Sequence, residues 1–290
     1  MAQTNEVIEQ LKCIMPNLTF KVIQIRTKGD ETREFEKNLV DGKSLFTQEI
    51  EDALVQDQID IAVHSMKDLT TDPSPRIVIA GVPKRANAHD VLVSRDKRKF
   101  SQLAPESRIG TTSLRRKSQL LAARGDLQVV DVRGNVDTRL RKLASGEFEA
   151  LVLAAAGLDR LHLDQHVAEV LSTKIMLPAV GQGALAIQTR KDNQEIKDLI
   201  VRIDHPSSRR EIEAERAFAR KLGANCRTPI AAYARSDSSK LTIEGMVASP
   251  SGRILVRGRI VSSDPDSSKV GEELAQSLLD QGAEAVLEAS

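Results

Sequence analysis

Arginine is concentrated between residues 107 and 143, and this stretch carries the strongest sign of chemistry in the chain. Its basic residues far outnumber its acidic ones, whereas the whole chain has a net charge of only +1. Two segments within it, GTTSLRR (110–116) and RGNVDTR (133–139), each follow a predicted strand and open a predicted helix. Both turns therefore bring arginine side chains to the start of a helix.

A turn from a strand into a helix is suited to binding an anion, because its backbone N–H groups and hydroxyls can face the ligand. The helix macrodipole disfavours cations at a helix N-terminus, so Arg133 and Arg139, held near one, indicate an anionic partner. Arginine also suits bidentate binding of carboxylate or phosphate. The sequence therefore favours an anion site, and the alternative is a solvated basic face.

A second candidate site is VHSMKDL (63–69), which follows the short β-branched run IDIAV (59–63). Open α/β sheets bind ligands at the ends of such strands. His64, Lys67 and Asp68 could act there as acid, base or charge stabiliser. The alternative is a polar helix cap in which Ser65 or Asp68 satisfies backbone donors, and the pattern alone favours that alternative.

The third candidate is Cys226, in LGANCRTP (222–229), which is expected to lie on a loop between a helix and a strand. A cysteine beside an arginine could be a thiolate nucleophile or a point of covalent attachment, although a lone cysteine is more often an inert small hydrophobe. Cys13 lies on the apolar face of a predicted helix and is expected to be core. Two cysteines form no disulfide framework, which favours a reducing cytoplasm, and the histidines show no metal-ligand pattern.

The elements that must position these residues alternate between helix and strand. This order predicts an α/β sheet with crossover helices, followed by a second α/β unit of similar size. In the first unit the segments are a helix at 6–15, a strand at 18–25, a helix at 45–55, a buried parallel strand at 59–63 and a strand at 76–82. In the second they are strands at 89–94, 107–113, 127–133 and 149–157, with helices at 114–124, 136–145 and 158–162.

The last third of the chain has a different pattern. Segments 83–88 and 177–183 are the expected hinges, and the strand 184–190 with the helix 192–203 is expected to return to the first unit. A charged helix at 208–222, three alternating strands and a closing helix at 268–288 predict a small α+β domain.

Composition excludes several classes of protein. Apolar residues make up 40% and charged residues 29% of the chain, as in ordinary globular proteins. Aromatic residues make up only 2%, which argues against binding single-stranded nucleic acid by base stacking. The sequence offers no apolar run long enough for a membrane helix, and its start, MAQTNEVIEQ, does not resemble a secretory signal.

Eight segments, taken together and in order, resemble the porphobilinogen deaminase family, whose members are also called hydroxymethylbilane synthases. They cover nearly the whole chain: GKSLFTQEIEDAL (42–54), DIAVHSMKDL (60–69), GTTSLRR (110–116), RGNVDTRLRKL (133–143), ALVLAAAGLDRL (150–161), LPAVGQGALAI (177–187), EAERAF (213–218) and GANCRTPIAAYA (223–234).

The resemblance implies a transferase of tetrapyrrole, and hence heme, biosynthesis. Such an enzyme condenses four porphobilinogen molecules head to tail, loses ammonia at each step and releases hydroxymethylbilane by hydrolysis. A dipyrromethane cofactor, made from two porphobilinogens, would be bound through a thioether to Cys226. Each pyrrole carries an acetate and a propionate, so the growing chain brings many carboxylates to the arginines.

The resemblance also implies roles for individual residues. Asp68, with Lys67, would be catalytic, stabilising the cation that forms as ammonia leaves and helping to move protons. The cofactor-binding residues would be Cys226, Lys43, Asp68, Thr111, Ser113, Arg115, Arg116, Arg133, Gly134 and Arg139. The substrate-binding residues would be Arg160, Gln182 and Phe46.

The implied fold is two α/β domains that resemble periplasmic binding proteins and are joined by a hinge, plus a small C-terminal α+β domain. The expected domains are residues 1–83 with 184–203, residues 88–178, and residues 206–290, which carry the cofactor cysteine. Family members begin with a strand and a turn of the type GTR-x-S-x-LA, whereas AQTNEVIEQL matches the helix after that turn. We therefore expect the first domain to lack its first strand, which exposes unpaired edges, and this form to be poorly stable and weakly active or inactive.

Two functions from other classes stay open on the sequence. One is a hinged two-lobe protein that binds a small anion without catalysis, because fold does not imply function; Cys226 on an added domain argues against it. The other is an RNA-associated protein, which the neutral net charge disfavours. The expected partner is porphobilinogen, with no metal, nucleic acid or membrane, and the expected form is a cytoplasmic monomer.

Overall fold

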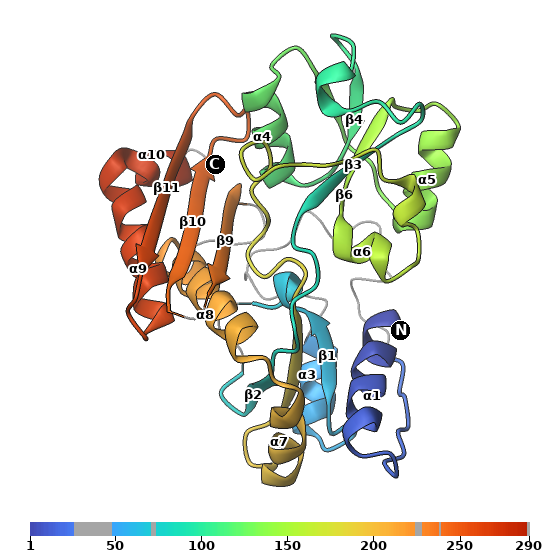
Figure 1. Cartoon of the computed structure of the whole chain (residues 1–290), viewed down its shortest axis with the longest axis vertical. Helices are drawn as coiled ribbons and strands as arrows, with labels where there is room; N and C mark the ends of the chain where they lie inside the picture. Colours follow the sequence, from blue (N-terminus) through green and yellow to red (C-terminus); the bar gives the residue numbers. More distant parts are fainter. Residues whose placement is uncertain (26–47, 71–73, 224–227, 238, 289–290) are drawn as a thin grey trace. The chain divides into compact units, whose positions relative to one another are not determined.

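The computed structural model describes residues 1–25, 48–70, 74–223, 228–237 and 239–288. The chain divides into two compact units, Met1–Arg85 with Ala184–Arg209 and Ala86–Gly183 with Arg210–Ser290. Figure 1 labels their helices and strands. No helix among the described residues is long and apolar enough to cross a membrane.

The first unit is built on a three-stranded sheet in the order β1 (Ala62–Ser65), β8 (Leu185–Arg190), β2 (Ile77–Gly81). Its α-helices in the described residues are α1 (Ala2–Ile14), α3 (Gln48–Val55) and α7 (Gln194–Ile200). The apolar face of α1 packs Val7 and Leu11 against Leu185, Ile187 and Ile200, which removes apolar surface from water. A 3₁₀ turn, Met66–Asp68, follows β1 directly.

Three expectations for this unit are wrong. The strand expected at 59–63 is β1, and it runs antiparallel to β8 rather than parallel, because an apolar run does not reveal the direction of its neighbour. Residues 18–25 form no strand; they line an apolar cavity of about 710 Å³ with α1 and residues 58–63, and a strand needs a paired edge to form. Cys13 is exposed, because it lies about 200° around the helix from the buried Leu11.

The second unit contains a five-stranded sheet whose strands β4, β5 and β6 are each followed by an α-helix. The strand order is β5 (Gln128–Val130), β4 (Arg108–Gly110), β6 (Ala150–Ala154), β3 (Asp90–Ser94), β7 (Glu169–Val170). β4 is parallel to β5 and β6, whereas β3 is antiparallel to β6 and β7. The helices are α4 (Leu114–Ala123), α5 (Val136–Ala144) and α6 (Ala155–Asp159), and α6 begins three residues earlier than the helix expected at 158–162.

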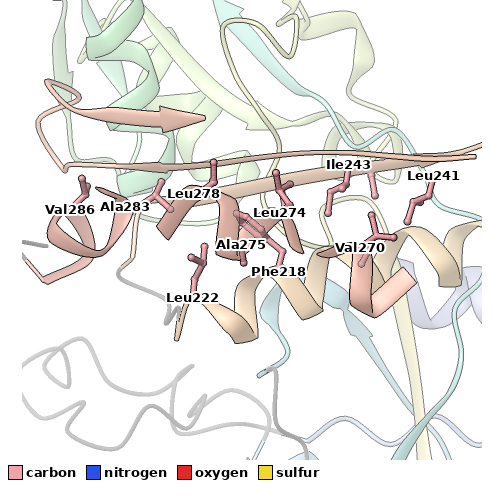
Figure 2. Packing of buried hydrophobic residues seen from close by; sticks show 14 residues of the cluster. Phe218, Leu222, Leu241, Ile243, Val270, Leu274, Ala275, Leu278, Ala283 and Val286 are labelled. Carbon is pink, nitrogen blue, oxygen red and sulfur yellow. The ribbon is translucent and has the colours of Figure 1, made fainter. Parts of the chain in front are cut away.

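The same unit contains an α+β layer made by the end of the chain. β9 (Ile230–Ser236), β10 (Leu241–Ala248) and β11 (Leu255–Ser262) form an antiparallel sheet. It is covered by α9 (Ser267–Leu278) and by α8 (Pro206–Lys221), which belongs to this unit from Arg210 onward. Figure 2 shows Phe218 of α8 and Leu274 and Leu278 of α9 in the apolar layer between these helices and the sheet, to which Ile243 of β10 also belongs. A Cβ on Gly245 of β10 would lie 2.7 Å from the Phe218 ring, so the helices can approach this closely only over glycine.

The helix expected at 268–288 is interrupted. α9 ends at Leu278, a π-helical turn covers Leu279–Ala283, and α10 runs over Glu284–Glu288. Gly282 has a φ of 91°, a conformation outside the right-handed helical region that glycine adopts at no steric cost. The α/β architecture with a small C-terminal α+β layer is confirmed.

Candidate active site

The first arginine-bearing turn connects β4 to α4 and is held by its own hydroxyls. The Ser113 hydroxyl caps α4 by accepting a hydrogen bond from the Arg116 backbone N–H at 3.4 Å. The Thr111 hydroxyl accepts one from the Ser113 N–H at 3.2 Å, and the Thr111 N–H donates to the Val130 carbonyl at 2.9 Å. These contacts fix the start of the helix, and so they position the side chains of Arg115 and Arg116.

Arg115 and Arg116 both donate hydrogen bonds to a buried carboxylate, that of Asp90. Arg115 Nη1 donates to Asp90 Oδ2 at 2.8 Å, and Arg116 donates to Asp90 Oδ1 through Nε at 2.9 Å and Nη2 at 2.7 Å. Asp90 is fully buried, and the arginines are only 6% and 7% exposed. Backbone carbonyls complete the cluster, Leu177 for Arg115 and Val152 for Arg116. A solvated basic face is therefore excluded for these two arginines.

The charges in this cluster do not cancel, since two guanidiniums face one carboxylate. Burial alone would raise the pKa of Asp90, but Arg115 and Arg116 outweigh burial and lower it to about 2. Burial also lowers the pKa of Arg115. Within the described residues, Nε and Nη2 of Arg115 have no hydrogen-bond partner. The cluster thus has one positive charge in excess and donors for an anion.

The second turn, between β5 and α5, also has a defined geometry. Asn135 caps α5 by accepting from the Thr138 N–H at 2.9 Å. Gly134 has a φ of +113°, and a Cβ there would lie 2.7 Å from the Thr138 side chain, so this turn needs glycine. Arg139 Nε donates back to the Gly134 carbonyl at 2.8 Å, whereas Arg133 is exposed.

The two turns contribute to one positive region. The pKa of Arg139 is lowered, first by burial and then by the charge of Arg116. The second cause means that the guanidiniums are close enough to repel each other, as the predicted anion site requires. An anion between them would relieve this repulsion.

The expected substrate residues Arg160 and Gln182 are held by backbone segments. Arg160 Nη2 donates to the Gly183 carbonyl at 3.4 Å, and Gln182 Nε2 donates to the Ala88 carbonyl at 2.7 Å. Gln182 is buried. A Cβ on Gly183 would lie 2.6 Å from the Ala86 carbonyl oxygen, so residues 86–88 and 181–183 are in close contact.

Asp68 and Lys67 lie in the first unit, on the 3₁₀ turn after β1. Both side chains are exposed. Ser65, at the N-cap position of the turn, makes no side-chain cap bond, so the cap interpretation is wrong for Ser65. The pKa of Asp68 is raised because the surrounding protein desolvates the carboxyl, although the side chain still reaches solvent. The positive charge of Lys67 and the neighbouring Ser65 oppose this shift in the pKa of Asp68.

Several expected residues have no structural test. Lys43, Phe46 and Cys226 lie outside the described residues.

Sequence reasoning missed Asp90, because nothing in the pattern of a strand indicates that a carboxylate is buried beside two arginines. It also missed the environment of His64, which is 7% exposed; burial lowers the pKa of His64 to about 4, and the neighbouring Gln188 opposes that shift. The described residues contain no cluster of three or more potential metal ligands.

Comparison with known proteins decides the family. Residues 1–198 match the family model "Porphobilinogen deaminase, dipyromethane cofactor binding domain", and residues 209–280 match "Porphobilinogen deaminase, C-terminal domain". The chain belongs to the porphobilinogen deaminase family. Porphobilinogen deaminase of Brevibacillus brevis is 42% identical over 99% of this chain and 93% of its own length. The porphobilinogen deaminase of Geobacillus kaustophilus is 43% identical over the same shares.

Among solved structures, the substrate binding protein of an amino acid ABC transporter aligns at 13% identity and a TM-score of 0.35, covering 69% of this chain and 78% of that one. That likeness is too distant to bear on function. Membership of the porphobilinogen deaminase family makes this chain a transferase of tetrapyrrole biosynthesis with a dipyrromethane cofactor. The described residues fit that cofactor, because its carboxylates would meet the excess positive charge around Asp90.

Proposed function

We propose that this chain condenses four porphobilinogen molecules head to tail on a dipyrromethane bound through a thioether to Cys226, and that hydrolysis then releases hydroxymethylbilane. Each condensation forms a carbon–carbon bond, breaks the carbon–nitrogen bond of the incoming aminomethyl group and releases ammonia. The single observation that carries the proposal is the buried cluster of Arg115, Arg116 and Asp90, with Arg139 repelled by Arg116. A product rich in carboxylates needs such an excess of guanidinium charge.

The arginines are proposed to bind acetate and propionate groups. Charge-assisted hydrogen bonds from arginine to carboxylate are strong and directional, and a helix N-terminus adds favourable dipole interaction with an anion. The proposed cofactor-binding residues are Lys43, Asp68, Thr111, Ser113, Arg115, Arg116, Arg133, Gly134, Arg139 and Cys226. The residues proposed to bind the incoming substrate are Phe46, Arg160 and Gln182.

Asp68 is proposed as the catalytic carboxylate, with Lys67 beside it. An ionised carboxylate stabilises the positive charge that develops as ammonia leaves, and it can accept a proton from the pyrrole. The bound dipyrromethane supplies the primer to which substrate is added. Partial desolvation of Asp68 favours this role, because electrostatic interactions strengthen where water is excluded.

We also propose that the enzyme works as a cytoplasmic monomer with three domains, residues 1–83 with 184–203, 88–178 and 206–290. The exposed Cys13 and the small number of cysteines support a reducing compartment.

The experiment is a turnover assay with porphobilinogen that follows ammonia release and tetrapyrrole formation. The expected result is turnover by the native chain, loss of cofactor attachment in Cys226→Ser, and retention of cofactor with nearly no elongation in Asp68→Asn. A cofactor-loaded native chain that releases no ammonia would overturn the proposal. Full turnover by Asp68→Asn would remove the role given to that carboxylate.

A further inference from the structure

The side chain of Gln119, on α4, holds the backbone of Leu177. Its Oε1 accepts a hydrogen bond from the Leu177 N–H at 2.7 Å, and its Nε2 donates to the Leu177 carbonyl at 3.1 Å. Gln119 is only 2% exposed, and Leu177 is fully buried. One amide therefore pairs both polar groups of a backbone unit 58 positions away, groups that are costly to bury without partners.

The same carbonyl also receives the guanidinium of Arg115. Arg115 Nη1 donates to the Leu177 carbonyl at 2.6 Å and to Asp90 Oδ2 at 2.8 Å. A guanidinium is planar and presents its donors in a fixed fork, so these two contacts set the direction of the others. Within the described residues, Nε and Nη2 of Arg115 have no hydrogen-bond partner. The position of the Leu177 carbonyl thus determines where these two donors point.

The side chain of Leu177 is fixed from a different part of the fold. It shares an apolar cluster with Ala231 of β9 and Met246 of β10. Leu177 is therefore held at its backbone by α4 and at its side chain by the C-terminal sheet. Since β9 follows Cys226 in the sequence, Leu177 connects that strand to the helix that carries Arg115.

We propose that Gln119 is a positioning residue that, by fixing the Leu177 carbonyl, directs Nε and Nη2 of Arg115 toward a carboxylate of the dipyrromethane. This inference rests on the proposed function, in which Arg115 binds that cofactor. Donors that are already oriented need no reorganisation when the reaction occurs. A neutral amide suits this place, because it holds Leu177 and leaves the excess positive charge around Asp90 unchanged.

The first test is Gln119→Met, which keeps a side chain of similar length and removes the hydrogen bonds to Leu177. In the cofactor-loaded full chain, kcat per loaded molecule should fall about tenfold, the size expected when one charged hydrogen bond is lost. Intact mass spectrometry gives the loaded fraction. KM for porphobilinogen should stay native, because the residues proposed to bind the incoming substrate are unchanged.

The matched control is Ser118→Ala, at the next position of α4. The Ser118 hydroxyl donates to the Arg115 carbonyl at 3.1 Å, and Gln119 Nε2 donates to that carbonyl at 3.2 Å. The control therefore removes a buried hydrogen bond of the same helix and leaves the pairing with Leu177 intact. Its kcat per loaded molecule should be native.

A second variant, Gln119→Glu, covers the case in which Gln119→Met damages folding. The glutamate keeps an acceptor for the Leu177 N–H. Its carboxylate would lie beside the carbonyl to which Arg115 Nη1 is bound, so it would attract Arg115 and cancel the excess positive charge. We expect kcat per loaded molecule to fall at least about tenfold, and a native kcat would overturn the inference.

Arginine side-chain NMR reports the geometry without turnover. In the purified chain labelled with nitrogen-15 arginine, the Nε–H of Arg115 is assigned by its absence in Arg115→Lys. In Gln119→Met it should exchange with water about tenfold faster, the factor expected for loss of about one hydrogen bond. Arg116, held by Asp90 and the Val152 carbonyl, should keep its native rate.

The outcomes separate this inference from the proposed function. If the native chain carries no cofactor and does not turn over porphobilinogen, the proposed function fails. If the native chain is active but both Gln119 variants keep its kcat, the inference alone is wrong. Equal losses in Ser118→Ala and Gln119→Met, or equal acceleration of exchange at Arg115 and Arg116, would also overturn it, because the effect would then come from α4 as a whole.

Discussion

The buried carboxylate of Asp90 should be the most sensitive single position in the second unit. Asp90→Asn keeps the size of the side chain but removes its charge, so Arg115 and Arg116 lose their shared partner. An amide oxygen cannot replace three contacts to charged donors, and the amide N–H groups would face other N–H groups. The variant therefore leaves two guanidiniums buried without compensation.

The expected loss in the free energy of unfolding is about 3–5 kcal/mol, the usual cost of removing one partner from a buried ion pair. The pKa of Asp90 gives a second measure. A shift from 3.8 to about 2 corresponds to about 2 kcal/mol of stability at neutral pH, since each pKa unit corresponds to about 1.4 kcal/mol. That contribution is present above the unfolded pKa and is lost as pH falls from 3.8 toward 2.

The assay is equilibrium unfolding in urea followed by tyrosine fluorescence. The chain has one tyrosine and no tryptophan, and Tyr233 lies on β9 in the same unit as Asp90, so the signal reports that unit. The matched control is Asp126→Asn, whose partner Arg124 lies 2.6 Å away with Asp126 itself 39% exposed. The control should leave the urea midpoint unchanged. If Asp90→Asn lowered the free energy of unfolding by less than about 1 kcal/mol, the reasoning would be refuted. Asp90 would then not be the buried charge that compensates Arg115 and Arg116.

Three further predictions concern pH, packing and ligand binding. Between pH 7 and pH 5 the free energy of unfolding of the first unit should fall by about 2 kcal/mol. In this range His64 gains a proton in the unfolded state, whereas in the folded state it gains one only near its lowered pKa of about 4. Chemical unfolding at both pH values checks this, and an equal loss in His64→Gln would contradict it. Gly245→Ala should cost about 1–3 kcal/mol through contact with the Phe218 ring, whereas Gly157→Ala, with no atom within 4 Å of the new Cβ, should cost less in the same urea experiment, and equal losses would count against the packing argument. Arg139→Leu should slow elongation without abolishing cofactor attachment, because one charged contact is worth about 1.5–3 kcal/mol; single-turnover kinetics checks this, and a native rate would exclude the contact.

Sequence reasoning succeeded where local chemistry sets the structure. The capping residues Ser113 and Asn135 and the turn glycine Gly134 locate both helix starts, so both arginine-bearing turns could be predicted. It failed where a distant partner decides. Residues 18–25 have a strand pattern but no paired edge in the described residues, and β1 takes its direction from β8, more than 100 residues later.

The candidate site shows the same division. The arginine segments stand out by composition. Asp90 lies in an otherwise apolar strand, and its importance becomes visible only through its ion pairs with Arg115 and Arg116. The link from Gln119 to Leu177 likewise joins residues with no local pattern in common. Tertiary contacts of this kind leave no periodicity or composition signal.

The central claim, an oligopyrrole primer attached to Cys226, is tested most directly by intact mass spectrometry with peptide mapping. The purified chain should carry the mass of two porphobilinogen molecules less two ammonia molecules, the adduct should map to the peptide containing Cys226, and Cys226→Ser should lack it. An active chain without added mass, or an adduct on the exposed Cys13, would contradict the account.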